Sequence, residues 1–265
     1  MEQLEPVLRS VFDRPKISLA NIPTPLEFAF ELSKKINRNI FIKRDDLTGA
    51  PLTGNKVRKL EYILADAKIK KASSVMTCGA TTSNHARATA IAARIAGLKP
   101  YLLLKKYNEP EKDHNNANIF LMRLVGAEIR FCDDEGYEKR NEIMLEWKKQ
   151  LNDNVYIIPE GGSNEIGIIG YIEAFREIVE DCKRINIKLD GIITAVGSGG
   201  TYAGLLIGKA LFEYDIPIYG YSVWRNPSYY KEEIAKIIAR FEESYYCKLN
   251  LTDEDIKIID ASYGY

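Results

Sequence analysis

The sequence predicts an α/β protein built on a mostly parallel sheet, and three observations carry that prediction. Short runs rich in β-branched residues alternate with longer segments of helical apolar spacing along nearly the whole chain. The 265 residues are ample for one or two domains with a substantial core. Hydrophobic residues make up 46% and charged residues 28%, as is ordinary for a soluble globular protein. Ligands of such βαβ folds bind beyond the carboxyl ends of the strands, so the functional residues are expected in the strand-to-helix loops.

The strands are expected where short β-branched runs occur. In chain order these runs are Ile40–Arg44, Ser74–Cys78, Tyr101–Leu104, Glu128–Phe131, Val155–Ile158, Gly191–Ala195, Ile218–Ser222 and Lys257–Ile259. Amphipathic segments lie between them. In Lys56–Ala67 the apolar residues recur at helical spacing, and the same reading applies to the later segments. These later helices are expected at Asn84–Ile95, Asn116–Val125, Arg140–Leu151, Ile166–Arg184, Tyr202–Phe212 and Tyr229–Tyr246.

Composition excludes several classes of function. Lys plus Arg and Asp plus Glu number 37 each, so the net charge of zero argues against a dedicated nucleic-acid binder. The only two histidines, His85 and His114, leave little room for a zinc site, and no metal is expected. The four cysteines form no CxxC pair and suggest no disulfide framework. With no signal peptide and no apolar run long enough for a membrane span, a cytoplasmic protein with no membrane partner is expected.

The first loop of chemical interest is Thr53–Tyr62. Gly54 and Asn55 suit a tight turn and an N-cap, which puts Lys56 in the first turn of a helix. The helix macrodipole lowers the pKa of an amine placed there, as an imine-forming lysine requires. The alternative is a solvated lysine on a basic helix start.

The second loop is Cys78–Arg87. Small and hydroxyl residues lead to Asn84 at a helix start, and the convergent donors suit a carboxylate or a phosphate. Any capped helix uses Ser and Asn, however, so the bare pattern also fits an ordinary helix start. A lone histidine such as His85 is more often a surface or core residue with paired ring nitrogens than a catalytic residue.

The third loop is Thr194–Gly204, in which three glycines fall within Gly197–Gly200. Backbone N–H groups can approach an oxyanion closely there, and the following helix directs its positive end at it. The loop is not a Walker motif, because no Gly-Lys-Ser/Thr follows. A glycine-rich turn without a ligand is the alternative.

Taken together, the three loops supply a candidate imine lysine, an anion-binding turn and a phosphate cradle. A phosphorylated aldehyde cofactor, pyridoxal 5′-phosphate, uses all three. A nucleotide-binding Rossmann-like protein that uses only Gly197–Thr201 is the competing interpretation, but it leaves Lys56 and the Ser83-Asn84 turn unexplained.

Four motifs in register resemble the 1-aminocyclopropane-1-carboxylate deaminase and D-cysteine desulfhydrase family, whose pyridoxal-phosphate fold is of the tryptophan-synthase-β type. The motifs are Gly54–Glu61, Ser83–Arg87, Pro159–Asn164 and Gly197–Thr201, with Pro23–Leu26 and Lys43–Leu47 fitting the opening segment. The resemblance runs from about Ile17 to the last residue. It implies fold type II, with two three-layer αβα domains: a large cofactor-binding domain of residues 1–50 plus 160–265 and a small domain of residues 51–159. Lys56 would lie at the junction, and the assembly would be a homodimer.

The resemblance also implies a role for each matched residue. Lys56 would bind the cofactor covalently, Ser83 would be catalytic by moving a proton, and Tyr265 would be the catalytic-site tyrosine, with Tyr263 the alternative. Substrate carboxylate binding would fall to Ser83, Asn84 and His85. The other cofactor-binding residues would be Lys59, Asn84, Val196, Gly197, Ser198, Gly199, Gly200 and Thr201.

The expected activity is that of a lyase or deaminase of a small amino acid. Deaminases of the family typically have glutamine where this chain has His85, so the resemblance favours conversion of D-cysteine to pyruvate, ammonia and hydrogen sulfide. Deamination of 1-aminocyclopropane-1-carboxylate is the alternative. Thr53 stands where the family usually has glycine, and its side chain would narrow the substrate side of the pocket. Family members continue beyond the position of Tyr265 with the acidic partner of the pyridine nitrogen, so a cofactor-binding but catalytically impaired protein is a further expectation.

Overall fold

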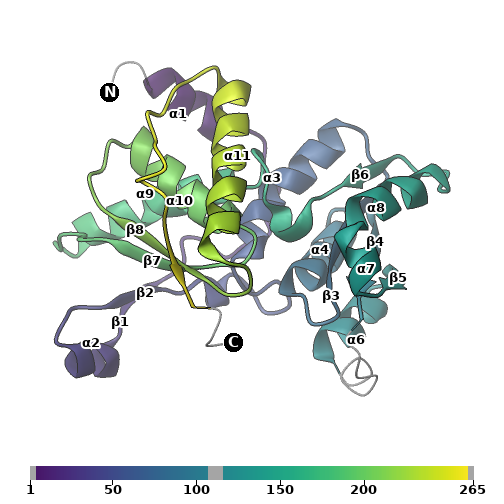
Figure 1. Cartoon of the computed structure of the whole chain (residues 1–265), viewed down its shortest axis with the longest axis horizontal. Helices are drawn as coiled ribbons and strands as arrows, with labels where there is room; N and C mark the ends of the chain where they lie inside the picture. Colours follow the sequence, from purple (N-terminus) through teal and green to yellow (C-terminus); the bar gives the residue numbers. More distant parts are fainter. Residues whose placement is uncertain (1–3, 107–115, 262–265) are drawn as a thin grey trace.

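Residues 4–106 and 116–261 are described by a computed structural model, which confirms the α/β class and the mostly parallel sheets (Figure 1). A four-stranded parallel sheet has the order β5-β4-β3-β6, and a three-stranded parallel sheet has the order β7-β8-β9. A short antiparallel pair joins β1 and β2. The strands are β1 (Leu26–Phe28), β2 (Phe41–Lys43), β3 (Ser74–Ala80), β4 (Lys99–Lys105), β5 (Glu128–Cys132), β6 (Val155–Ile157), β7 (Ile192–Val196), β8 (Ile218–Ser222) and β9 (Lys257–Asp260).

Helices alternate with the parallel strands as the sequence predicts. They are α1 (Glu5–Phe12), α2 (Phe30–Ile36), α3 (Lys56–Ile69), α4 (Asn84–Ile95), α6 (Ala117–Leu124), α7 (Asp134–Glu138), α8 (Arg140–Lys149), α9 (Ile169–Arg184), α10 (Gly200–Leu211) and α11 (Pro227–Tyr245). Two 3₁₀ turns, η1 (Asp45–Leu47) and η2 (Glu160–Gly162), complete the set. Every predicted strand and helix is present with ends within three residues of the expected ones. The sequence missed β1, α1, α2 and α7. β1 has three residues and α7 has five, too few for a clear period, whereas α1 has eight, as many as the predicted α6.

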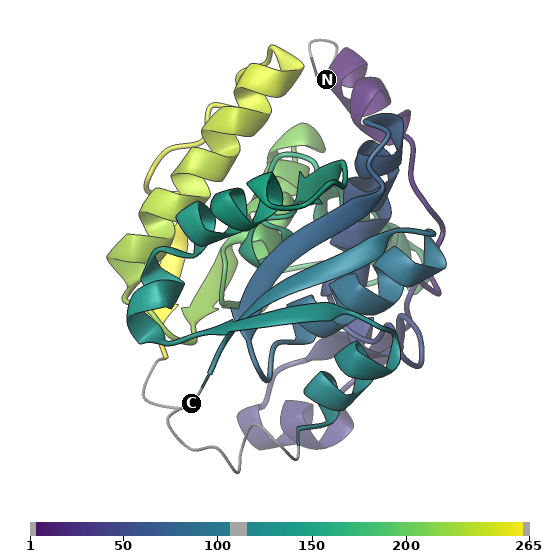
Figure 2. The ribbon, with the colours of Figure 1, turned by 90° about the vertical axis from the view of Figure 1, so that its right-hand side faces the viewer.

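The two inner strands of the four-stranded sheet, β3 and β4, are buried along almost their whole length, whereas the edge strand β5 is mostly exposed. Side chains alternate along β4: Leu102 and Leu104 pack toward α4 and α6, whereas Tyr101 and Leu103 pack with Trp147 of α8. Figure 2 shows β3, β4 and β5 side by side within this sheet. The arrangement places the carboxyl end of β3 directly before the start of α4, where the Ser83-Asn84 turn lies.

Close contact between α3, α9 and α10 brings two of the chemical loops together. A Cβ added at Gly170 of α9 would lie 2.3 Å from the backbone oxygen of Arg58 in α3. A Cβ added at Gly204 of α10 would lie 2.5 Å from the Cβ of Tyr171 in α9. Side chains at either position would force the helices apart. The glycines therefore let the starts of α3 and α10 approach each other.

Replacing Gly170 with alanine is expected to destabilise the protein by about 2 kcal/mol. Alanine is normally the better helix former by about 1 kcal/mol, but here its Cβ would collide with a backbone atom that has no rotamer to move. Urea denaturation measures the effect. A variant at least as stable as the natural sequence would show that α3 and α9 are not held at this spacing.

A buried ion network fixes α3 to α9 and to the segment before it. Arg58, of which only 1% is exposed, donates from Nη1 to Glu177 Oε1 at 2.8 Å and from Nη2 to Asp45 Oδ1 at 2.9 Å. Burial opposes the charge of Arg58, yet the hydrogen bonds to Glu177 and Asp45 outweigh it and raise the pKa of the guanidinium. Lys43 pairs with Glu177 at 3.1 Å and with Asp181 at 2.8 Å. The network therefore sets where the residues on either side of Arg58 point.

None of the helices in residues 4–106 and 116–261 is both long and apolar enough to cross a bilayer. The division into a large and a small domain with the boundaries given above stays a prediction.

Candidate active site

Lys56 is the first residue of α3, and its amine is shifted toward the neutral form. Burial lowers the pKa of Lys56 to about 8, and the charge of Glu160 partly opposes that effect. Its Nζ lies 3.3 Å from Asn55 Oδ1. At pH 7 about one amine in ten is then neutral, against roughly one in three thousand for a lysine with the ordinary pKa. This neutral fraction is what a nucleophilic lysine needs.

Asn55 does not cap α3 with its side chain, which corrects the sequence expectation. Its backbone is already right-handed helical, with φ −57° and ψ −23°, whereas a capping side chain works from an extended backbone. Its Nδ2 instead donates to Thr201 Oγ1 at 3.0 Å. The bond joins the residue before Lys56 directly to the start of α10.

Lys59 lies one turn further along α3 and is buried. Its Nζ donates to the Gly161 carbonyl oxygen at 3.2 Å and to Ser163 Oγ at 3.4 Å. Burial, followed by the positive charge of Lys56, holds the pKa of Lys59 well below its ordinary value. An anion near this amine would remove the cost of charging it.

The loop after β7 is held in place by hydroxyl groups. Val196 is buried at the end of the strand, and the Gly197 carbonyl accepts from the Tyr230 hydroxyl at 3.2 Å. Ser198 Oγ lies 2.9 Å from Ser163 Oγ. The glycine-rich loop and the segment that contains Ser163 therefore face each other.

Gly200, the first residue of α10, has no room for a side chain. Its N–H donates to Ser163 Oγ at 3.2 Å, and Gly199 before it has φ +80°, which favours glycine. A Cβ at Gly200 would lie 2.5 Å from Ser163 Oγ and 2.8 Å from Lys59 Nζ. A backbone N–H, hydroxyls and a buried amine thus converge on one helix start, which is the donor set that a phosphate requires. The residues present therefore fit the phosphate of pyridoxal phosphate, with Lys56 one turn from Lys59.

Ser83 and Asn84 stand at the start of α4. Ser83 Oγ accepts from the Ala86 N–H at 3.1 Å and so caps the helix, which leaves its hydroxyl proton available. Asn84 is exposed, and its Oδ1 accepts from Asn118 Nδ2 at 3.2 Å. Both residues therefore have structural partners in addition to the substrate role that the sequence suggests.

His85 is the buried member of this turn. Its Nε2 lies 2.9 Å from Thr77 Oγ1, and Thr77 also donates to the Ile158 carbonyl at 2.9 Å. Burial, and then the positive charges of Lys56 and Lys59, hold the pKa of His85 well below its ordinary value. The imidazole is therefore neutral at pH 7. Its Nδ1 is buried without a hydrogen-bond partner among the described residues.

The sequence did not assign roles to Ser163, Glu160 or Thr77. The first two lie in the Pro159–Asn164 motif, which was the available signal, whereas Thr77 lies inside a strand and gives none. The predicted catalytic residue Tyr265 and its alternative Tyr263 lie outside the described residues.

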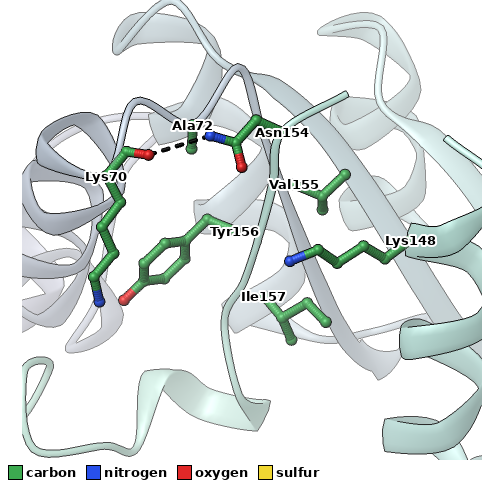
Figure 3. Close-up of a pocket in the computed structure, with 7 residues that line it drawn as sticks. All are labelled: Lys70, Ala72, Lys148, Asn154, Val155, Tyr156 and Ile157. Carbon is green, nitrogen blue, oxygen red and sulfur yellow. Dashed lines mark hydrogen bonds between the residues drawn. The ribbon is translucent and has the colours of Figure 1, made fainter. Parts of the chain in front are cut away.

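A groove of about 340 Å³ lies elsewhere, along β6 between the end of α3 and α8 (Figure 3). Lys70, Lys148 and Tyr156 contribute to its lining, and none of its lining residues belongs to the three loops. Tyr156 donates to Asp66 at 2.7 Å. This groove adds nothing to the site.

Comparisons with known proteins point to the same chemistry. A family model described as "Pyridoxal-phosphate dependent enzyme" matches residues 17–265. The chain is 44% identical to a Thermotoga maritima protein named as a candidate 1-aminocyclopropane-1-carboxylate deaminase, over 86% of this chain and 72% of that protein. It is 36% identical to the D-cysteine desulfhydrase of Salmonella typhi, over 85% of this chain and 68% of that protein. A crystal structure of an ACC deaminase homologue matches with a TM-score of 0.85 and 34% identity, covering 98% of this chain and 78% of that one.

Proposed function

The chain belongs to the pyridoxal-phosphate dependent enzymes, in the family of 1-aminocyclopropane-1-carboxylate deaminases and D-cysteine desulfhydrases, and we propose that it is a D-cysteine desulfhydrase. The reaction converts D-cysteine and water to pyruvate, ammonia and hydrogen sulfide. The observation that carries the proposal is His85, a neutral imidazole beside two lysines at the position where the deaminases typically have glutamine. A small amino acid is the substrate class, and a cytoplasmic homodimer is the proposed form.

The residues that hold the cofactor are proposed from the donors described above. Lys56 would bind it covalently, and Lys59 with the loop Val196–Thr201 would hold its phosphate. Ser163 supplies a hydroxyl at the same place. Asn84 would bind the phenolic oxygen of the cofactor. The bound cofactor supplies the electron sink that makes the substrate Cα–H acidic.

The chain's own residues then position the substrate and move protons. The Ser83 hydroxyl and the N–H groups at the start of α4 bind the substrate carboxylate, because a helix start favours an anion. Lys56, with its lowered pKa, takes the proton from Cα at Nζ. Since the Thr77 hydroxyl donates to the Ile158 carbonyl, Nε2 of the neutral His85 ring carries the proton, and Nδ1 can accept a hydrogen bond from the substrate. Because the His85 ring is buried, it also excludes water from the side of the substrate that faces it.

A substrate comparison tests the proposal. The purified protein, loaded with pyridoxal phosphate, is assayed on D-cysteine, D-serine, L-cysteate and 1-aminocyclopropane-1-carboxylate, with pyruvate, hydrogen sulfide and 2-oxobutyrate measured. D-Cysteine is expected to give the highest kcat/KM. In His85→Gln the preference for D-cysteine over the cyclopropane substrate is expected to fall by about tenfold or more.

Faster turnover of the cyclopropane amino acid than of D-cysteine by the natural sequence would make the deaminase assignment correct instead. Arg9→Gln provides the control, because this exposed residue pairs only with Glu5 of its own helix among its described contacts. Its substrate preference is expected to match that of the natural sequence.

A further inference from the structure

Thr77 places a buried hydroxyl between His85 and the residue that follows β6. It lies in β3, on the face opposite to Met76 and Cys78, and it is fully buried. A valine would fill the same space, and a buried hydroxyl costs stability unless it is hydrogen-bonded. The Thr77 oxygen has two partners, His85 Nε2 at 2.9 Å and the Ile158 carbonyl oxygen at 2.9 Å. The hydroxyl therefore links the start of α4 to the end of β6.

The single proton of this hydroxyl is directed at the Ile158 carbonyl. Ile158 is buried, and its own N–H donates to the Met76 carbonyl at 2.8 Å, which fixes the acceptor beside β3. Among the described residues the Ile158 carbonyl has no other hydrogen-bond donor. If Thr77 donated to His85 instead, this buried carbonyl would lose its partner, which is costly. Thr77 therefore accepts from the ring, and Nε2 of His85 carries the ring proton.

The other ring nitrogen of His85 is left as an acceptor beside the candidate site. Nδ1 is buried and has no hydrogen-bond partner among the described residues. A Cβ added at Gly162 would lie 3.7 Å from Cε1, the ring carbon between the two nitrogens, and 3.6 Å from Lys59 Cβ. The ring therefore borders the segment whose Gly161 carbonyl accepts from Lys59 Nζ. A neutral ring with its proton on Nε2 can only accept a hydrogen bond at Nδ1.

We propose that Thr77 is the positioning residue that fixes this tautomer of His85, and that the fixed tautomer makes the site select small amino acids whose side group donates a hydrogen bond. The thiol of D-cysteine and the hydroxyl of D-serine carry such a hydrogen, whereas the ring of 1-aminocyclopropane-1-carboxylate carries only C–H groups. A donor on the substrate is favoured because it pairs the buried Nδ1, which a C–H group leaves unpaired. Thr77 acts only through His85. The inference rests on the proposed role of His85 in substrate binding.

NMR spectroscopy of the full chain with ¹⁵N-labelled histidine reads the tautomer directly. The chemical shift of a ring nitrogen shows whether that nitrogen carries a proton. The chain has two histidines, so the His85 signals are those that disappear in His85→Gln. The natural sequence at neutral pH is expected to show a proton on Nε2 and none on Nδ1. A ring with its proton on Nδ1 would overturn the proposal.

Variants of Thr77 test whether its hydroxyl holds the tautomer. Thr77→Val keeps the shape of the side chain but removes the acceptor of Nε2, so the His85 signals are expected to shift toward those of a mixture of the two tautomers. Thr77→Ser keeps a hydroxyl and is expected to leave the signals in their natural positions. Ser74→Ala is the matched control, because it removes from the same strand a buried hydroxyl that has no partner among the described residues. Unmoved His85 signals in folded Thr77→Val would contradict the proposal.

Substrate preference separates this role from a merely structural one. In the cofactor-loaded protein, Thr77→Val is expected to lower the ratio of kcat/KM for D-cysteine over the cyclopropane substrate by about tenfold, and Thr77→Ser to keep it. Adding Thr77→Val to His85→Gln is expected to change the ratio no further, since both act through one ring. Additive effects of the two substitutions would overturn the proposal.

Two further points keep the test decisive. If Thr77→Val does not fold, Thr77→Cys takes its place, because a thiol is a weaker acceptor for Nε2, and its His85 signals are expected to shift in the same direction. Unmoved signals in that variant would contradict the proposal. The tautomer measurement uses no substrate, so it remains readable even if the substrate comparison rejects D-cysteine.

Discussion

Replacing Lys56 with alanine is expected to abolish the visible absorbance band of the lysine-bound cofactor and to lower kcat by at least about 10³-fold. The variant loses the amine that we propose binds the cofactor and serves as the base at Cα. The fold should persist, because Lys56 contributes one bond to its neighbour Asn55, whereas the adjacent Arg58 carries the buried network. Absorbance spectra and the pyruvate assay measure the two effects.

Lys68→Ala is the matched control, since it removes an exposed lysine from the same helix. It is expected to keep both the absorbance band and the turnover. A normal band in Lys56→Ala would mean that another lysine binds the cofactor. Lys59 would then be examined first, because it is the other buried lysine of the site.

Replacing Arg58 with methionine is expected to destabilise the protein by about 3–5 kcal/mol. Methionine fills much of the same volume, but Asp45 keeps only the Thr24 and Tyr171 hydroxyls and Glu177 keeps only Lys43 among the described residues. The main cost is that Asp45 is left with no cation and the buried Glu177 with one cation in place of two. Urea denaturation gives the change, and the displaced start of α3 should also weaken cofactor binding.

Arg9→Met is the control for this measurement. It breaks an ion pair whose two side chains are 76% and 59% exposed, and solvent screens such a pair. Its urea midpoint should stay close to that of the natural sequence. Loss of less than about 1 kcal/mol in Arg58→Met would show that packing rather than the ion network holds α3.

The parallel strands and the long helices could be predicted from local patterns. The strands contain runs of β-branched residues, and the helices contain apolar residues at helical spacing. The apolar positions of residues 56–67 fixed α3, and β-branched runs fixed the strands of both parallel sheets. Some short elements were missed, although the three-residue strands β2 and β6 were predicted. The five residues of α7 make little more than one turn, and its place depends on Tyr137 packing into the sheet core.

Within the site, the residue types were predictable and their partners were not. The lysine at a helix start and the glycine-rich loop were visible in the sequence. The bond from Asn55 to Thr201 joins positions 146 residues apart, and no local pattern encodes such a pair. The same holds for Glu160, which accepts from the Tyr137 hydroxyl of α7 and forms an ion pair with Arg140 of α8.

By itself the sequence determined the α/β class, the order of the elements and the kind of chemistry, because periodicity and motif spacing are local properties of the chain. Only the tertiary structure decided which groups meet and how their protons are held. The pKa values of Lys56, Lys59 and His85 depend on burial and on charges brought from distant segments. Desolvation and Coulomb interactions act through space, so they exist only once the chain is folded.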